Sequence, residues 1–159
     1  MKTKLFTVAL LLGSVVAFTQ NAVAQQGASA KDEAAIKKVI EGLTTSMYAR
    51  DLKTYLNYWS TAPYVSRVST DREGKVTKMT GDEWRKTVEK AAAQNPKPSQ
   101  ETATRDNWLI RVNGNAAFVV FDQHNQYADG TTRDSVEERY LERVNNEWKI
   151  VSVTVLPRK

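Results

Sequence analysis

Residues 102–156 read TATRDNWLIRVNGNAAFVVFDQHNQYADGTTRDSVEERYLERVNNEWKIVSVTVL, and this part of the chain has the periodicity of β-strands. Apolar and polar side chains alternate along four segments, as in strands, where successive side chains point to opposite faces. Asn113-Gly114, Asp129-Gly130 and Asn145-Asn146 separate the segments, and these residue types tolerate the positive φ of tight hairpin turns. We therefore expect an antiparallel meander of strands over 102–112, 115–127, 132–144 and 147–156.

The preceding residues have helical periodicity. Apolar residues between 36 and 47 recur at i, i+3, i+4, i+7 and i+11, which predicts an amphipathic helix. Asp51 is placed to cap a short second helix over 52–59. Two short strands, over 64–69 and 76–79, are expected to follow it.

A third helix is predicted after these short strands. Thr80 and Glu83 have the spacing of a capping box, in which each side chain accepts a hydrogen bond from the other residue's backbone N–H. The helix should end at Asn95-Pro96, because a proline disfavours helical backbone in the residue before it. Helices followed by a long meander indicate an α+β fold, with the helices packed on one face of a curved sheet.

The N-terminus has the features of a cleavable export signal. Lys2 and Lys4 precede an apolar run over residues 5–18, and Ala22 and Ala24 are the small residues that a signal peptidase reads. The run is shorter than the roughly 20 residues of a membrane-spanning helix, which disfavours the alternative of an uncleaved anchor. No cysteine follows it, which excludes a lipid-anchored lipoprotein. We expect a signal peptide over 1–24, a flexible lead-in over 25–31 and one domain over 32–157, in a periplasmic or secreted protein.

Composition excludes several classes of site. The chain has no cysteine, which removes disulfides, thiol catalysis and zinc–thiolate sites, and no three metal ligands stand at a recognisable spacing. We therefore expect no metal and no cofactor. The 23 basic and 18 acidic residues are interspersed and give a formal net charge of +5, of which Lys2 and Lys4 contribute two. This pattern indicates no nucleic-acid partner, and after signal cleavage no membrane partner is expected.

Several motifs resemble the nuclear transport factor 2-like superfamily. They are AFVVFDQ over 117–123, the Asp129-Gly130 turn, the Glu137-x-Arg139 pair and EWKIV over 147–151. The chain is most similar to the SnoaL-like branch, which includes the association domain of calcium/calmodulin-dependent kinase, over about Asp32 to Leu156. The resemblance implies three N-terminal helices packed on a strongly curved antiparallel sheet, which together form a cone-shaped half-barrel with a pocket. Members of this superfamily include isomerases, dehydratases, cyclases, hydrolases and non-catalytic modules, so the fold does not determine the function.

Strand alternation then assigns side chains to this pocket. By the resemblance, the face of the last strand that carries Trp148 and Ile150 is concave, and strict alternation adds Ser152 and Thr154 to it. The Glu-x-Arg motif likewise implies that its two charged side chains point inward. Aromatic walls with a few polar groups are typical of small-molecule sites. The predicted ligand-binding residues are Trp59, Gln123, Asn125, Tyr127, Glu137, Arg139, Ser152 and Thr154.

Two interpretations of the Glu-x-Arg pair remain open. Arg139 has a planar fork of donors that suits a carboxylate, a phosphate or a carbonyl oxygen of a ligand. Alternatively, Glu137 and Arg139 form a structural ion pair, because buried charges are costly unless they are paired.

Catalytic residues are harder to identify. Relatives of this branch often carry histidines at the two positions occupied here by Ser152 and Thr154, and a hydroxyl is no base near neutral pH without an activating partner. The one histidine, His124, shares a strand face with Asp122. These two residues are the catalytic candidates, as an acid–base dyad or half of a metal site. The alternative is a polar pair on the outer face, since Asp-x-His lacks the third, orienting group of a catalytic site.

The convex face of the sheet is expected to be apolar as well. An outer face that meets water would alternate more cleanly between apolar and polar residues, and a large apolar surface usually marks an interface. Relatives commonly dimerise through this surface, so we expect a homodimer. The residues assigned to the convex face are Phe118, Val120, Tyr140, Val151, Val153 and Val155.

These features lead to three functional hypotheses. The first is an exported domain that binds a small molecule in its pocket. The second is a cofactor-independent lyase, isomerase or hydrolase, which requires an acid–base pair with a perturbed pKa inside the pocket. The third is a structural dimerisation module, whose pocket would be filled by its own side chains.

Overall fold

The computed structural model describes residues 28–71 and 73–158. The predicted signal peptide over 1–24 therefore lies outside the described residues, as does the predicted lead-in up to residue 27. Among the residues described, no helix has the length and apolar character needed to cross a membrane.

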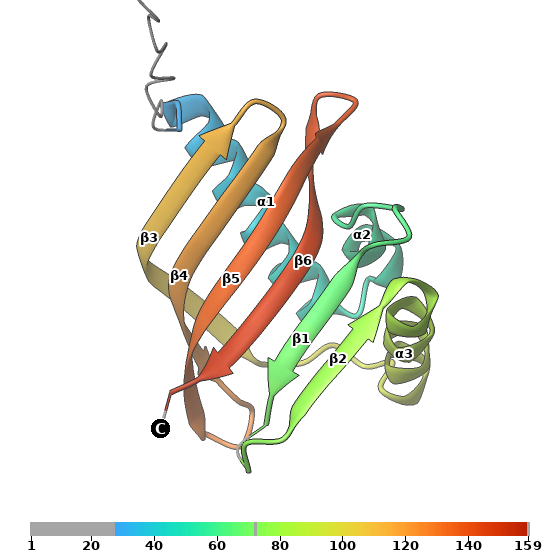
Figure 1. The fold of residues 1–159 in the computed structure, drawn as a ribbon. Coiled ribbons are helices and arrows are strands. Elements are labelled where there is room, and N and C mark those ends of the chain that lie inside the picture. The colour runs from blue at the N-terminus through green and yellow to red at the C-terminus, as the bar shows by residue number, and fades with distance from the viewer. Residues whose placement is uncertain (1–27, 72, 159) are drawn as a thin grey trace, which may run out of the picture.

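A curved, unclosed six-stranded sheet forms most of the fold (Figure 1). From one edge to the other its strands are β2 (Val76–Thr80), β1 (Ser66–Thr70), β6 (Glu147–Pro157), β5 (Thr132–Val144), β4 (Ala116–Gln126) and β3 (Thr102–Asn113). All neighbours are antiparallel except β1 and β6, which run parallel. The sheet is thus mixed, and the expectation of an antiparallel sheet was wrong for the β1–β6 pair. β1 and β6 are far apart in the chain, so no hairpin dictates their relative direction.

The predicted C-terminal meander is confirmed, with strand ends within one residue of those expected. Its turns use the residues that the sequence singled out. Asn145 and Asn146 have φ of 52° and 64°, the positive values that a two-residue hairpin turn requires at both positions.

The three predicted helices are also confirmed. α1 (Ala30–Ala49) begins earlier than the predicted domain start at Asp32, because the Ser29 side chain caps it. Its buried residues include Ile36, Ile40 and Leu43, the expected apolar stripe. In α2 (Leu52–Asn57) the Asp51 carboxylate accepts from the Thr54 backbone N–H at 3.0 Å, as the sequence predicted.

The capping box predicted for α3 (Gly81–Gln94) does not form, because Thr80 makes no capping hydrogen bond with its side chain. Thr80 is instead the last residue of β2, where it pairs with Ser66 of β1. Gly81, with φ of 49°, turns the chain directly from the strand into the helix.

The helices lie against the concave side of the sheet. α1 crosses this face behind β4, β5 and β6 in Figure 1, and α3 lies beside β2. Arg143 of β5 donates to Asp32 at the start of α1 and lies 4.4 Å from the Trp148 ring, which ties the helix to the sheet. Trp59 after α2 and Trp84 of α3 are both buried, with ring centroids 4.1 Å apart.

Candidate functional site

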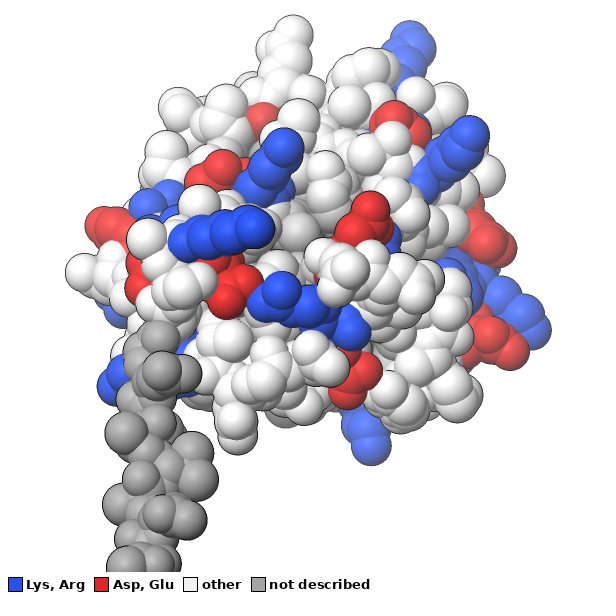
Figure 2. Space-filling view, turned by 90° about the horizontal axis from the view of Figure 1, so that it is seen from above, with Lys and Arg blue, Asp and Glu red and all other residues white. Residues whose placement is uncertain are grey.

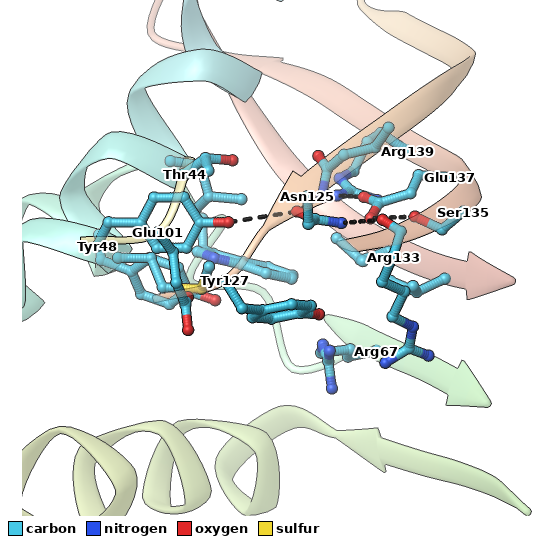
Figure 3. Close-up of a pocket in the computed structure, with 17 residues that line it drawn as sticks. Thr44, Tyr48, Arg67, Glu101, Asn125, Tyr127, Arg133, Ser135, Glu137 and Arg139 are labelled. Carbon is cyan, nitrogen blue, oxygen red and sulfur yellow. Dashed lines mark hydrogen bonds and ion pairs between the residues drawn. The ribbon is translucent and has the colours of Figure 1, made fainter. Parts of the chain in front are cut away.

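A cavity of about 200 Å³ lies between α1, α2 and the concave face of β1, β4, β5 and β6 (Figure 3). The apolar lining residues are Leu43, Met47, Tyr55, Trp59, Val153 and Val155. The polar lining residues include Arg67, Glu101, Gln123, Asn125, Arg133, Ser135, Glu137 and Arg139. On the sheet the two kinds alternate between strands, since Val153 of β6 pairs in register with both Arg67 of β1 and Arg139 of β5. An apolar wall with a few convergent polar groups is the usual composition of a small-molecule site.

Six of the eight predicted ligand-binding residues line this cavity. They are Trp59, Gln123, Asn125, Tyr127, Glu137 and Arg139. Gln123 and Asn125 of β4 and Glu137 and Arg139 of β5 thus lie on the face that alternation assigned to the cavity. The cavity brings together groups that are as much as 80 residues apart in the chain, from Trp59 to Arg139.

Ser152 and Thr154 do not line the cavity, and this part of the predicted site was wrong. Tyr140 pairs with Ser152 but Leu141 pairs with Ile150, so Val151 is an extra residue in β6, a β-bulge. The bulge reverses the faces of all residues beyond it. Ser152 therefore bonds to the Ser66 hydroxyl at 3.0 Å on the other face of the sheet.

The same bulge corrects the assignment of the convex face. Val153 and Val155 were expected there, but both line the cavity. Val151 itself is only 4% exposed. The exposed apolar side chains on the convex face come instead from β3, β4 and β5, and include Leu109, Phe118 and Tyr140.

Glu137 and Arg139 form a buried ion pair at the inner end of the cavity. The Arg139 Nη2 atom donates to Glu137 Oε2, and the Ser135 hydroxyl donates to Glu137 Oε1 at 3.1 Å. The Arg139 guanidinium also lies 5.3 Å from the Phe121 ring. Glu137 and Arg139 thus form the ion pair of the structural interpretation, and both also line the cavity.

A chain of amide hydrogen bonds crosses the cavity wall, as Figure 3 shows. Asn125 Nδ2 donates to the Arg133 carbonyl at 3.2 Å, which fixes Asn125 Oδ1 as the acceptor for Gln123 Nε2 at 3.0 Å. Gln123 Oε1 is consequently the free end of the chain, and it is buried without a hydrogen-bond partner in the part of the protein that the structure describes. Buried acceptors of this kind are rare, so it calls for an explanation.

Tyr48 of α1 completes this chain. Its hydroxyl donates to Asn125 Oδ1 at 3.3 Å. Burial raises the pKa of the Tyr48 hydroxyl to about 12, and the nearby Glu101 carboxylate adds to the effect. Tyr48 is therefore a protonated hydrogen-bond donor throughout the neutral pH range and cannot act there as a base.

Two further arginines line the cavity without a carboxylate partner. Arg67 Nη1 donates to the Ser69 hydroxyl at 3.2 Å, and Arg133 Nη2 donates to the Thr70 carbonyl at 2.9 Å. Within residues 28–71 and 73–158, neither makes an ion pair. Both side chains are half-buried and line the cavity.

Sequence reasoning missed these two arginines for different reasons. Arg133 lies on the same face of β5 as Ser135, Glu137 and Arg139, so extending the Glu-x-Arg alternation toward the start of the strand would have found it. Arg67 lies on a short strand whose face is set by parallel pairing with Val153 of β6, and no local pattern reports that pairing.

The catalytic candidates lie outside the cavity. Asp122 accepts from Asn107 Nδ2 at 2.7 Å and from Arg158. His124 lies on the outer face between Asp134, at 3.0 Å from Nδ1, and Asp106, at 3.4 Å from Nε2. Asp122 and His124 therefore each bond to other residues, and the suggested dyad is not formed. Within the described part of the chain, no three His, Asp or Glu side chains are grouped so as to hold a metal ion.

The molecular surface shows no block of one charge on the face seen in Figure 2. Lysine and arginine side chains are interspersed there with aspartate and glutamate. The cavity lining, in contrast, has more guanidinium groups than carboxylates, with three arginines and two glutamates.

Comparison with known proteins agrees with this architecture. The association domain of calcium/calmodulin-dependent kinase II from C. elegans is 21% identical with a TM-score of 0.61, over 79% of this chain and 95% of that one. A nuclear transport factor 2-like protein of unknown function from Pseudomonas putida is 12% identical with a TM-score of 0.65, over 82% and 89%. A proposed dehydratase of the nuclear transport factor 2-like family from Streptomyces avermitilis is 15% identical with a TM-score of 0.64, over 81% and 97%.

Identities this low show the fold alone, and no curated protein matches the sequence. The family itself is established by sequence, since the model of the SnoaL-like domain matches residues 36–155. This match covers α1 to β6, and thus every element that contributes to the cavity. The chain therefore belongs to the SnoaL-like domain family of the nuclear transport factor 2-like superfamily.

Proposed function

We propose that this protein is an exported domain that binds a small organic acid in the cavity. The observation that carries the proposal is a pair of cavity arginines, Arg67 and Arg133, that have no carboxylate partner among the described residues. A guanidinium offers planar, paired donors that match a carboxylate, and a half-buried site strengthens such a charge-assisted hydrogen bond. The ligand's carboxylate would lie at these two arginines.

The unpartnered Gln123 Oε1 supports a second contact. An acceptor buried in a cavity wall is stabilised by a donor, which a ligand hydroxyl or N–H would supply. The acid would thus carry its carboxylate at one end and a donor group toward Gln123. A cavity of about 200 Å³ has room for a single ring or a short chain, since a cavity of about 150 Å³ already binds benzene.

Binding is favoured over catalysis because, apart from Glu101, the acidic and basic groups of the cavity are already paired or are in the wrong protonation state to act as a base. Glu137 already accepts from Ser135 and Arg139, and the sole histidine lies on the outer face. Tyr48, with a pKa of about 12, is a donor and no base. A lyase is the alternative function, because one structural neighbour is a proposed dehydratase. For that function, Glu101 in the cavity lining is the remaining acid–base candidate.

Two further aspects belong to the proposal. Export to the periplasm or out of the cell is proposed from the signal-like residues 1–24. A homodimer through the convex face is supported by the exposed Leu109, Phe118 and Tyr140, and by the kinase association domain among the neighbours. An open polar cavity argues against a module whose only role is dimerisation.

The proposal is tested by comparing acids with their neutral isosteres. Calorimetric titration of the purified protein with benzoate and butanoate, and with benzamide and butanamide, separates charge recognition from shape. We expect the acids to bind and to raise the unfolding midpoint, and the amides to bind at least about tenfold more weakly, because a hydrogen bond to a charged group contributes about 1.5–3 kcal/mol. Equal binding of acids and amides, or no binding of either, would refute an acid site.

A further inference from the structure

A second chamber lies next to the cavity, where the end of α1 meets α2 and α3. It has a volume of about 150 Å³. Its lining is largely apolar and includes Leu52 of α2 and Val88, Ala91 and Ala92 of α3. The Ser46 hydroxyl, which also borders it, donates to the Leu43 carbonyl at 2.9 Å and is thereby satisfied. Arg50, directly after α1, also lines the chamber, and its Nε donates to the Lys97 carbonyl at 3.3 Å. Apart from Ser46 and Arg50, the described lining residues are apolar or aromatic.

Met47 and Tyr55 line both spaces and so form the partition between them. Tyr55 is 8% exposed and fixed between Trp59 and Trp84, with ring centroids 6.4 and 6.3 Å away. Met47 is 40% exposed and has only its unbranched, flexible thioether side chain in this position. Of the two, Met47 is the part of the partition that can change rotamer.

We infer that the second chamber receives the apolar tail of the acid whose carboxylate lies at Arg67 and Arg133. This inference rests on the proposed function and specifies its substrate class, which is a monocarboxylic acid with a linear or aromatic hydrocarbon tail. The tail passes Met47 and lies against Leu52, Val88 and Ala92. A chamber of about 150 Å³ accommodates a group of roughly six carbon atoms, the size of benzene.

The inference predicts how affinity depends on tail length. Burial of one methylene lowers the dissociation constant about fourfold, since its transfer from water contributes about 0.8 kcal/mol. The gain should begin when the tail is long enough to pass Met47 and should stop when the second chamber is full. Polar tails should give a smaller gain, because apart from Arg50 the lining would leave their hydrogen-bonding groups unpaired.

The experiment is a titration of the protein with straight-chain carboxylates from acetate to decanoate, below their micellar concentrations. We expect octanoate to bind at least about tenfold more tightly than butanoate. The variant Ala92→Leu fills the chamber and should remove this gain while butanoate affinity stays the same. Ala93→Leu is the matched control, because Ala93 lies on the same helix but is exposed and does not line the chamber.

The outcomes separate this inference from the proposed function. Equal affinity for butanoate and octanoate, or an undiminished gain in Ala92→Leu, overturns the tail chamber and leaves the acid site standing. If octanol binds as tightly as octanoate, and both lose affinity in Ala92→Leu, the chamber binds tails but the acid site is wrong. If the gain in affinity with tail length requires both the carboxylate and an unfilled chamber, both the tail chamber and the acid site are supported.

Discussion

Arg139 and Glu137, two residues apart on β5, form an ion pair whose members are 5% and 3% exposed. Their side chains share one face of the strand, and the pair lies at the inner end of the cavity. An ion pair this deeply buried stabilises the fold little relative to an apolar pair of the same volume, but removal of one partner leaves the other charge buried alone.

Arg139→Met should therefore lower the free energy of unfolding by about 3–5 kcal/mol, because Glu137 loses its partner. The double variant Glu137→Leu with Arg139→Met should recover most of this loss. Urea denaturation followed by circular dichroism measures both effects. A cost below about 1 kcal/mol for the single variant would contradict a buried ion pair between Glu137 and Arg139.

Arg67→Gln should reduce ligand affinity but leave the stability of the fold nearly unchanged. Arg67 is half-buried and has no carboxylate partner, so the free energy of unfolding should change by no more than about 1 kcal/mol. Benzoate affinity should fall about tenfold or more, because one charged hydrogen bond is lost. Arg111→Gln is the matched control, since Arg111 is exposed and pairs in register with Phe118 on the convex face. If both variants lose the same benzoate affinity, the loss comes from the change in net charge and not from a contact with Arg67.

The bulge at Val151 predicts a contrast between neighbouring residues of β6. Val153→Thr should destabilise the protein by about 1–3 kcal/mol, because it places a hydroxyl in the buried interior at a residue that is 4% exposed. Thr154→Val, the reverse exchange on the other face, should change the free energy of unfolding by less than about 0.5 kcal/mol. Thermal and urea unfolding of both variants checks this. If the larger cost falls on Thr154→Val, β6 has no bulge there.

This bulge also marks the limit of what the sequence could predict. The segment VSVTV over 151–155 alternates equally well in either phase, so no residue in it shows that Val151 is the extra one. The strands, hairpin turns and helix stripes follow from local patterns of polarity, and these predictions were confirmed. Ser152 was assigned to the wrong face and Arg67 was missed, because their faces depend on pairing between distant strands, which a local pattern does not encode.

His124 should make stability depend on pH in a defined direction. Hydrogen bonds to Asp134 and then Asp106 raise the pKa of the imidazole above its usual 6.5, against a smaller opposing effect of burial. A raised pKa in the folded state stabilises the protein below the unfolded pKa, and the contribution is lost as pH rises through the folded pKa. The difference in unfolding midpoint between the wild type and His124→Gln should thus be larger near pH 5.5 than near pH 8.5, within the approximate range where the aspartates remain ionised.

Asp134→Asn is the companion variant, because Asp134 makes the shorter of the two histidine contacts. It should remove much of the same pH dependence while His124 is retained. Thermal unfolding across this pH range tests both variants. A difference that grows with rising pH would mean that burial, which lowers the pKa of a histidine, outweighs the two carboxylates.

The apolar surface on the convex face allows a test of the proposed homodimer. Phe118 and Tyr140 are direct partners across β4 and β5, 42% and 39% exposed, and Leu109 beside them is 45% exposed. Aromatic residues at the centre of an interface often contribute 2 kcal/mol or more, so Phe118→Arg should weaken dimerisation by about thirtyfold or more. Val76→Arg is the control, because Val76 is apolar and 63% exposed but lies on the edge strand β2, away from this pair. Sedimentation over a range of protein concentrations distinguishes the two. If Phe118→Arg still sediments as a dimer, or the wild type is a monomer at all concentrations, the convex face is no interface between copies of this chain.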